Sequence, residues 1–202
     1  FSDTFGKLIA VTPSAGTALI AQLGDLMHVD DYTNQTPTGR HIVDADTRYY
    51  LIVRRTVALM KMAIEVLRQK YPRVVYTSVP GNHEKSSAPG ITIGLEQAYS
   101  DTLGVEIVPN FSAHHMMEWG KNMLLMTHGD KAPPDRLVHF AAAQWPETWG
   151  RTKHRMALSG HIHHQTRKEV GGMTVESFGT IIPRDSYAYG HAFSAQRQLV
   201  SI

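Results

Sequence analysis

The side chains best suited to chemistry in this chain are grouped in four short segments. These segments are Gly24-Asp25, Gly81-Asn82-His83-Glu84, His128-Gly129-Asp130 and Gly160-His161-Ile162-His163. Their Asp, Asn and His residues offer oxygen and imidazole nitrogen donors, and the chain contains no cysteine that would add a thiolate. Such a donor set suits Mn²⁺, Fe²⁺, Zn²⁺ or Ni²⁺ and is a poor match to Ca²⁺. The residue types therefore predict a site for divalent transition-metal ions.

Each of the four segments follows a short apolar run that predicts a buried strand. The runs are residues 17–23, 74–79, 123–127 and 156–159. Polar loops at one end of the strands of an α/β sheet form the crevice in which ligands bind. A glycine before Asp25, Asn82 and His161 would let the backbone turn sharply toward a ligand. We therefore expect the four segments to meet in one place.

His161 and His163 are two residues apart. In an extended segment, side chains at this spacing point to opposite faces. The two imidazoles would then bind different ions, or one ion on each side of a bridge. A pair of metal ions can clamp the attacking and leaving oxygens of a phosphoryl centre and lower the pKa of a bound water. The spacing is thus compatible with a site for two metal ions, and such a site could hydrolyse a phosphate ester.

Taken together, the four segments resemble the calcineurin-like metallophosphoesterase superfamily in order and spacing, from about residue 17 to residue 165. The resemblance implies hydrolysis of a phosphate ester by a water activated by two divalent metal ions, with Mn²⁺ the first choice. It also implies a set of ligands. Asp25 would bridge the two ions, Asn82, His128 and His161 would complete one site, and His163 would belong to the other.

The same resemblance gives catalytic roles to three more residues. His83 would lie beside the scissile phosphate and protonate the leaving oxygen, and Glu84 would hold His83 in orientation. His28 stands where many members have aspartate, and histidine there is typical of DNA double-strand-break repair exonucleases. The run 24–31 and the loop after it also look like phage- and prophage-encoded phosphoesterases of that kind. His28 would either contact the substrate or hydrogen-bond a ligand, and both roles stay open.

The chain departs from the superfamily near its beginning. The Asp-x-His motif, which supplies two ligands to the metal paired with His163, is not found. In Ser2-Asp3-Thr4-Phe5, phenylalanine stands where the histidine would be, and we expect residues 3–12 to form the end of a helix. The first strand is then expected upstream of Phe1, which leaves the first metal site of this chain incomplete. A degenerate motif at Asp3 is the alternative.

The rest of the pattern predicts the elements that carry these loops. After a polar loop over 30–46, apolar residues at steps of three and four from Val53 to Leu67 predict a helix beginning near residue 47, with Asp46 as N-cap. Helices at 93–103 and 135–144, a strand at 105–108, a hairpin at 167–178 and a last strand at 199–202 are also expected. The expected fold is one α/β domain over residues 1–202. It has two mixed β-sheets packed face to face with flanking helices, and it lacks the first strand.

The other histidines and tryptophans lack the spacing of ligands. We expect the pair His114-His115 to lie exposed at a turn. Trp119, Trp145 and Trp149 are expected to pack in the core rather than to stack on bases. The loop 183–187 is expected to border the site.

The composition narrows the classes of function. Hydrophobic residues make up 42% of the chain, which is typical of a globular protein, and the net charge of +2 is too small to argue for nucleic acid or a membrane by itself. No apolar run approaches the roughly 20 residues of a membrane span, and no signal-peptide pattern is visible. Because cysteine is also absent, we expect a cytoplasmic protein.

The expected function is hydrolysis of a phosphate ester, and a phosphodiester, with DNA as a candidate, is the leading substrate. The alternative among enzymes is a phosphomonoesterase or a small-nucleotide phosphodiesterase. The alternative outside enzymes is a non-catalytic metal-binding or protein-interaction module on the same scaffold. Metal content separates these classes, since two bound ions per chain favour an enzyme and one or none favours the module. The sequence gives no oligomeric state.

Overall fold

The computed structural model describes residues 2–43, 45, 48–182 and 189–190. The chain divides into two compact units, unit 1 (Phe1–Ala113) and unit 2 (His114–Ile202). Each unit has a β-sheet and a hydrophobic core of its own, and helices flank the sheets, so the expected α/β class is confirmed. A single domain over 1–202 and the face-to-face packing of the two sheets stay predictions.

Unit 1 is built on a sheet with the strand order β1-β2-β3. Its elements in chain order are α1 (Ser2–Val11), β1 (Thr17–Gln22), α2 (Tyr49–Arg68), β2 (Arg73–Ser78), α3 (Ser87–Tyr99) and β3 (Val105–Val108). Both strand pairs are parallel. A mixed sheet had been expected, and for unit 1 that expectation is wrong. The reason is that a helix lies in each connection, and such crossovers return the chain in the same direction.

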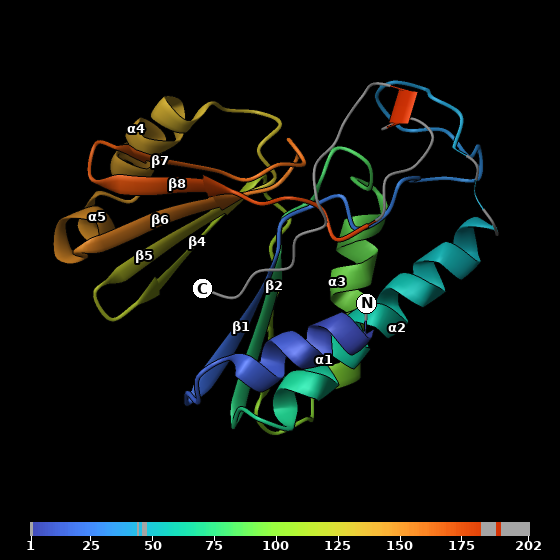
Figure 1. Cartoon of the computed structure of the whole chain (residues 1–202), viewed down its shortest axis with the longest axis horizontal. Coiled ribbons are helices and arrows are strands. Elements are labelled where there is room, and N and C mark those ends of the chain that lie inside the picture. Colours follow the sequence, from blue (N-terminus) through green and yellow to red (C-terminus); the bar gives the residue numbers. More distant parts are fainter. Residues whose placement is uncertain (1, 44, 46–47, 183–188, 191–202) are drawn as a thin grey trace. The chain divides into compact units, whose positions relative to one another are not determined.

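The helices of unit 1 pack against one face of this sheet. Ile20 on β1, Tyr76 on β2 and Ile107 on β3 share a core with Ile64 of α2 and Leu95 of α3. In Figure 1, α1, α2 and α3 are seen beside the strands β1 and β2. The periodicity that predicted α2 is confirmed, because its apolar stripe faces this core. The expected helix at 3–12 is confirmed as α1.

Unit 2 contains a mixed sheet with the order β4-β5-β6-β8-β7. Its elements are β4 (His114–Trp119), β5 (Asn122–Thr127), α4 (Pro134–Gln144), α5 (Pro146–Arg151), β6 (His154–Ser159), β7 (Thr166–Val170) and β8 (Met173–Ser177). Strands β5, β6 and β8 are parallel, and β4 and β7 pair antiparallel at the two edges. Leu125, Ala157 and Val175 form a core with Leu137 and Val138 of α4. The predicted hairpin is confirmed as β7 and β8.

Helix α3 begins earlier than the helix expected at 93–103 and runs from Ser87 to Tyr99. The cause is a side chain far away in the sequence. The Asp30 carboxylate accepts hydrogen bonds from the backbone N–H groups of Ser86 and Ser87, at 2.7 and 2.8 Å, and from the Ser87 hydroxyl at 2.5 Å. A carboxylate in this place satisfies N–H groups that the first turn leaves without partners.

Two expectations about aromatic residues are wrong. His114 and His115 are not exposed at a turn but are half-buried in β4. This strand had not been predicted. It pairs with β5, and a turn at Gly120 connects the two strands. Trp119, expected in the core, is 54% exposed at the end of the same strand. Trp145 and Trp149 do pack against the core of unit 2.

Three predictions fall on residues that the structure does not describe. They are Asp46 as a helix cap, the loop 183–187 at the site and the last strand at 199–202. Helix α2 begins at Tyr49 with Arg48 in the N-cap position. Within the described ranges, no helix is both long and apolar enough to cross a membrane.

The burial of His114 makes the stability of unit 2 depend on pH. Its ring lies 4.8 Å from the ring of Phe140 on α4. Burial lowers the pKa of His114, although the charge of Asp130 opposes this. As the pH falls through about 6.5, the unfolded chain therefore binds more protons than the folded one. The free energy of unfolding decreases as a result.

His114→Phe is expected to remove this titration. The free energy of unfolding, measured with urea at about pH 7.5 and about pH 5.5, should fall less for His114→Phe than for the parent protein. His139→Phe is the matched control, since His139 is an exposed histidine on α4. Equal pH dependence in the parent protein and His114→Phe would contradict the assignment.

Candidate metal centre

The loops after β1 and β2 bring five of the predicted site residues into one part of unit 1. We call these residues, Asp25, His28, Asn82, His83 and Glu84, half-site 1. The two strands are parallel and in register to their carboxyl ends, where Gln22 lies opposite Ser78. The Val79 N–H donates to the Gln22 carbonyl at 3.0 Å. The two loops therefore leave the sheet side by side, as the sequence predicted for the first two segments.

Glu84 ties these two loops together. Its side chain is 1% exposed, and its carboxylate accepts hydrogen bonds from the backbone N–H groups of Asp25 at 2.8 Å, Gly81 at 2.9 Å and Met27 at 3.5 Å. Burial raises the pKa of Glu84 to about 7, against the lowering effect of the hydrogen bond from Gly81. Glu84 therefore positions the backbone that carries Asp25, and its role in orienting the ring of His83 stays a prediction.

Asp25 is held in a strained backbone position by a close approach of the two loops. Its φ is 55°, in the left-handed region that most side chains avoid, although aspartate adopts it more readily than most. The His83 N–H donates to Asp25 Oδ1 at 3.0 Å. Strain of this kind persists where the surrounding contacts over-determine it, and it is concentrated at functional sites.

The ring of His83 lies between His28 and the carboxylate of Asp25. Its Nδ1 is 3.3 Å from the backbone carbonyl of His28, and its Nε2 is 3.9 Å from Asp25 Oδ2. A carbonyl only accepts, so Nδ1 carries the hydrogen in this contact. A second proton on the ring would then sit on Nε2, facing the side where Asp25 lies. The His28 ring is exposed, with its centroid 5.8 Å from that of His83.

The loops after β5 and β6 carry the predicted residues of unit 2. We call His128, His161 and His163 half-site 2. His128 is 2% exposed directly after β5, and His161 follows β6, which is parallel to β5. The Gly160 N–H donates to the His128 carbonyl at 2.9 Å, and His128 Nε2 lies 3.2 Å from His161 Nδ1.

Two imidazole nitrogens at this separation suit one metal ion. At Zn–N distances of about 2.0–2.1 Å, two ligands of a tetrahedral ion lie about 3.3 Å apart. Ring nitrogens from two separate strands thus converge as ligands do. Their donor chemistry fits the transition metals predicted from the sequence.

The loop of His161 and His163 is not extended. The prediction that their side chains point to opposite faces assumed an extended segment, and this assumption is wrong. Both residues have positive φ, 64° for His161 and 57° for His163, and both are exposed. The Ile162 N–H donates to the Gly160 carbonyl at 2.8 Å, which closes a tight turn. Histidine tolerates the left-handed region better than most residues. The turn, not strand alternation, sets the direction of the two rings.

Gly81 is the position at which the close approach of the loops can be tested. A Cβ added there would lie 2.2 Å from both the backbone nitrogen and Oδ1 of Asp25. Gly81→Ala is therefore expected to destabilise the protein by about 1–3 kcal/mol, as overpacking does, and to weaken metal binding.

The readouts for Gly81→Ala are urea unfolding and metal content. Gly94→Ala is the matched control, because nothing lies within 4 Å of a Cβ at Gly94 and the position is exposed in α3. The control should be neutral or more stable by about 0.4–1 kcal/mol. Equal stability of Gly81→Ala and the parent protein would show that the loops are not held together as described.

Comparison with known proteins gives matches only among solved structures. No family model and no curated protein matches the chain. A conserved uncharacterized protein from Streptococcus pneumoniae, described as a predicted phosphoesterase, is 14% identical with a TM-score of 0.33, covering 84% of this chain and 75% of that one. Vacuolar protein sorting 29 of Entamoeba histolytica, complexed with Zn²⁺, is 15% identical with a TM-score of 0.34, covering 82% and 74%.

Vacuolar protein sorting 29 of Cryptosporidium parvum is similar at the same level, with 15% identity, a TM-score of 0.33 and coverage of 82% and 74%. One of these three is described as a phosphoesterase and the other two as sorting proteins. At such identities and TM-scores the function has to be argued from the residues of this chain.

Proposed function

We propose that half-sites 1 and 2 together bind divalent metal ions and hydrolyse a phosphate ester, and that the chain is a calcineurin-like metallophosphoesterase. The observation that carries the proposal is the pair His128 and His161, whose ring nitrogens lie 3.2 Å apart at the ends of two parallel strands. Asp25, His128 and His161 are the proposed core of the ligand set, with Asn82 and His163 added. Mn²⁺ is the proposed ion.

Bound metal ions would hold the phosphoryl oxygens and lower the pKa of the attacking water. The residues of half-site 1 would do the rest. The His83 N–H donates to Oδ1 of Asp25, which would fix the direction of the carboxylate as a ligand. His83 would hold a proton on Nε2 for the leaving oxygen, with Nδ1 fixed by the His28 carbonyl. Glu84 would keep both loops in place.

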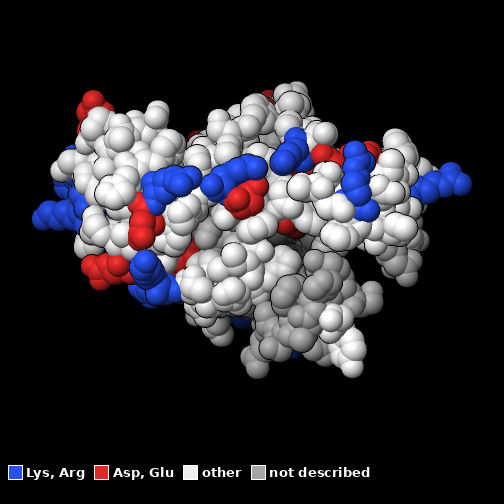
Figure 2. Space-filling model, turned by 90° about the horizontal axis from the view of Figure 1, so that it is seen from above, with Lys and Arg blue, Asp and Glu red and all other residues white. Residues whose placement is uncertain are grey.

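A phosphodiester is the proposed substrate, and DNA is the candidate polymer. The proposal of a nuclease related to phage-encoded phosphoesterases rests on the resemblance of His28 and the run 24–31. It does not rest on the surface charge. The net charge is only +2. On the face drawn in Figure 2, Lys and Arg side chains stand in separate groups with Asp and Glu among them. A cytoplasmic location is proposed from the sequence, which contains neither cysteine nor an apolar run of membrane-span length.

The test is hydrolysis with Mn²⁺ of bis-p-nitrophenyl phosphate, of p-nitrophenyl phosphate and of single-stranded DNA, with metal counted in the same preparation. Turnover of the diester above that of the monoester supports the proposal. Preference for the monoester would replace the phosphodiesterase by a phosphomonoesterase. Metal binding without turnover of any of the three would leave a metal-binding module and would overturn the enzyme.

A further inference from the structure

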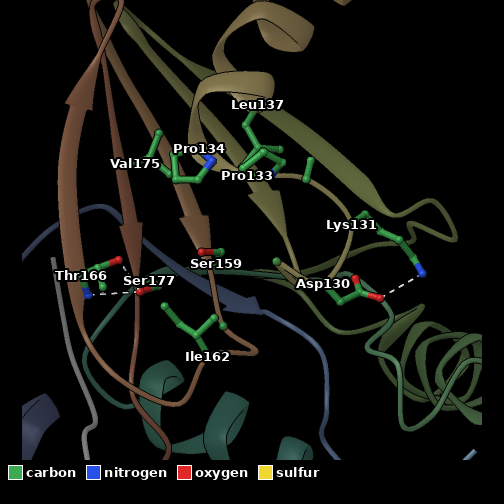
Figure 3. Close-up of a pocket in the computed structure, with 13 residues that line it drawn as sticks. Asp130, Lys131, Pro133, Pro134, Leu137, Ser159, Ile162, Thr166, Val175 and Ser177 are labelled. Atoms are coloured by element: carbon green, nitrogen blue, oxygen red, sulfur yellow. Dashed lines mark hydrogen bonds and ion pairs between the residues drawn. The ribbon is translucent and has the colours of Figure 1, made fainter. Parts of the chain in front are cut away.

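A pocket of about 320 Å³ lies within unit 2, beside the loops of half-site 2. Figure 3 shows it between the beginning of α4, where Pro133, Pro134 and Leu137 lie, and the ends of β6 and β8, where Ser159 and Ser177 lie. Ligand pockets have volumes of about 300–1,000 Å³. This one is at the small end of the range, so it suits one ring of a ligand and not a whole nucleotide.

The pocket is built from the same two loops that carry His128 and His161. Gly129 and Asp130, directly after His128, form one side, and Ser159 and Gly160, directly before His161, form another. The loops touch at Gly129, whose φ is 105° and where a Cβ would meet the Gly160 carbonyl oxygen at 3.3 Å. A group in the pocket would therefore lie next to the proposed metal centre.

The hydroxyl groups that line the pocket offer acceptors. The Ser177 hydroxyl donates to the His164 carbonyl at 3.0 Å, so its single proton is used there. Thr166 Oγ1, 2.8 Å from Ser177 Oγ, must then be the donor of that pair. This leaves the lone pairs of Thr166 Oγ1 to accept. The Ser159 hydroxyl likewise directs its proton to the Glu176 carbonyl, at 3.4 Å.

The charged groups at the rim leave the pocket with more hydrogen-bond acceptors than donors. Asp130 adds two acceptor oxygens. Among the described residues that line the pocket, Lys131 is the one cation, and it is paired with Asp130 at 3.0 Å. The remaining walls at Pro133, Pro134 and Val175 are apolar. The pocket thus fits a flat, largely apolar ring that donates hydrogen bonds, and it does not fit an anion.

We propose that this pocket binds an amino-bearing nucleobase of the substrate next to the scissile phosphate. The assignment rests on the proposed function, because it takes the ring in the pocket and the phosphate at the metal centre to belong to one molecule. An exocyclic amino group would donate to Thr166 Oγ1, and the apolar walls would cover the faces of the ring. The substrate class is therefore a nucleotide ester of adenine, cytosine or guanine, the bases that carry an exocyclic amino group.

The test compares nucleosides that differ only in the amino group. Binding is measured by calorimetry on the whole chain in the presence of a chelator. The three pairs are adenosine and purine riboside, cytidine and 2-pyrimidinone riboside, and guanosine and inosine. At least one amino nucleoside is expected to bind about fivefold to tenfold more tightly than its partner, which corresponds to one hydrogen bond. Thr166→Val should remove the preference, and Ala132→Trp, which fills the pocket from its rim, should remove the binding.

Thr17→Val is the matched control, because Thr17 lies at the amino end of β1 in unit 1. It should bind as the parent protein does. Equal affinities within all three pairs, no nucleoside binding, or a preference that survives in Thr166→Val would overturn the assignment. Since no metal is present in this assay, such a result would leave metal-dependent hydrolysis untouched. Conversely, an absence of hydrolysis in the assay with Mn²⁺ would not affect the measured binding of nucleosides.

Discussion

His83→Ala is expected to lower kcat on a phosphodiester by about 10²–10⁴-fold, the usual loss on removing a general acid, and to leave the bound metal unchanged. The reason is the geometry of its ring. Nδ1 contacts the His28 carbonyl and Nε2 lies 3.9 Å from Asp25 Oδ2, so the ring lies beside a proposed ligand. The hydrogen bond from His83 to Asp25 Oδ1 comes from the backbone N–H, and alanine keeps that N–H.

The measurement is kcat with saturating Mn²⁺ together with metal content by mass spectrometry. His139→Ala is the matched control, since it removes an exposed histidine on α4 and should change neither quantity. Loss of metal in His83→Ala would assign His83 to the ligands. An unchanged kcat would remove it from the chemistry.

Asn82→Ala is expected to act on the metal. Loss of a residue that only supports a ligand costs about 10–100-fold in metal affinity, so loss of a ligand should cost at least about 100-fold. Turnover should fall with it and should recover in part at high Mn²⁺ concentration. The neighbours of Asn82 are held independently, Gly81 by Glu84 and His83 by Asp25, so the loop should keep its conformation.

The matched control is Asn122→Ala, at the amino end of β5, where the side chain donates to the Trp119 carbonyl. It should keep the affinity for metal. An Asn82→Ala protein with parent affinity for Mn²⁺ would exclude Asn82 from the ligand set. Recovery at high Mn²⁺ separates this variant from His83→Ala, which should not recover.

The elements that carry the site could be predicted from the sequence because their signals are local. The apolar runs that became β1, β2, β5 and β6 are short, and each ends at a polar segment. The apolar stripe of α2 repeats at helical spacing from Val53 to Leu67. Parallel strands in register then place Gln22 beside Ser78 and Met126 beside Leu158, which brings the loops within each unit together.

The parts that could not be predicted depend on contacts between residues far apart in the chain. Asp30 caps α3 from 56 and 57 residues away and so moves its beginning to Ser87. Glu84 was assigned to its neighbour His83, but its carboxylate reaches back 59 residues to the N–H of Asp25. The strand of His114 and His115 was missed because its polar residues hide the alternation, and pairing with β5 decides its structure.

The most direct test of the central claim, that half-sites 1 and 2 share their metal ions, is a double-mutant comparison of metal content. Metal is counted in the parent protein, in Asp25→Ala, in His161→Ala and in the variant carrying both. If the ions are shared, either single substitution removes the same ion, and the double variant loses no more than the single ones. Independent losses that add in the double variant would show that each unit binds metal on its own, and would contradict the account.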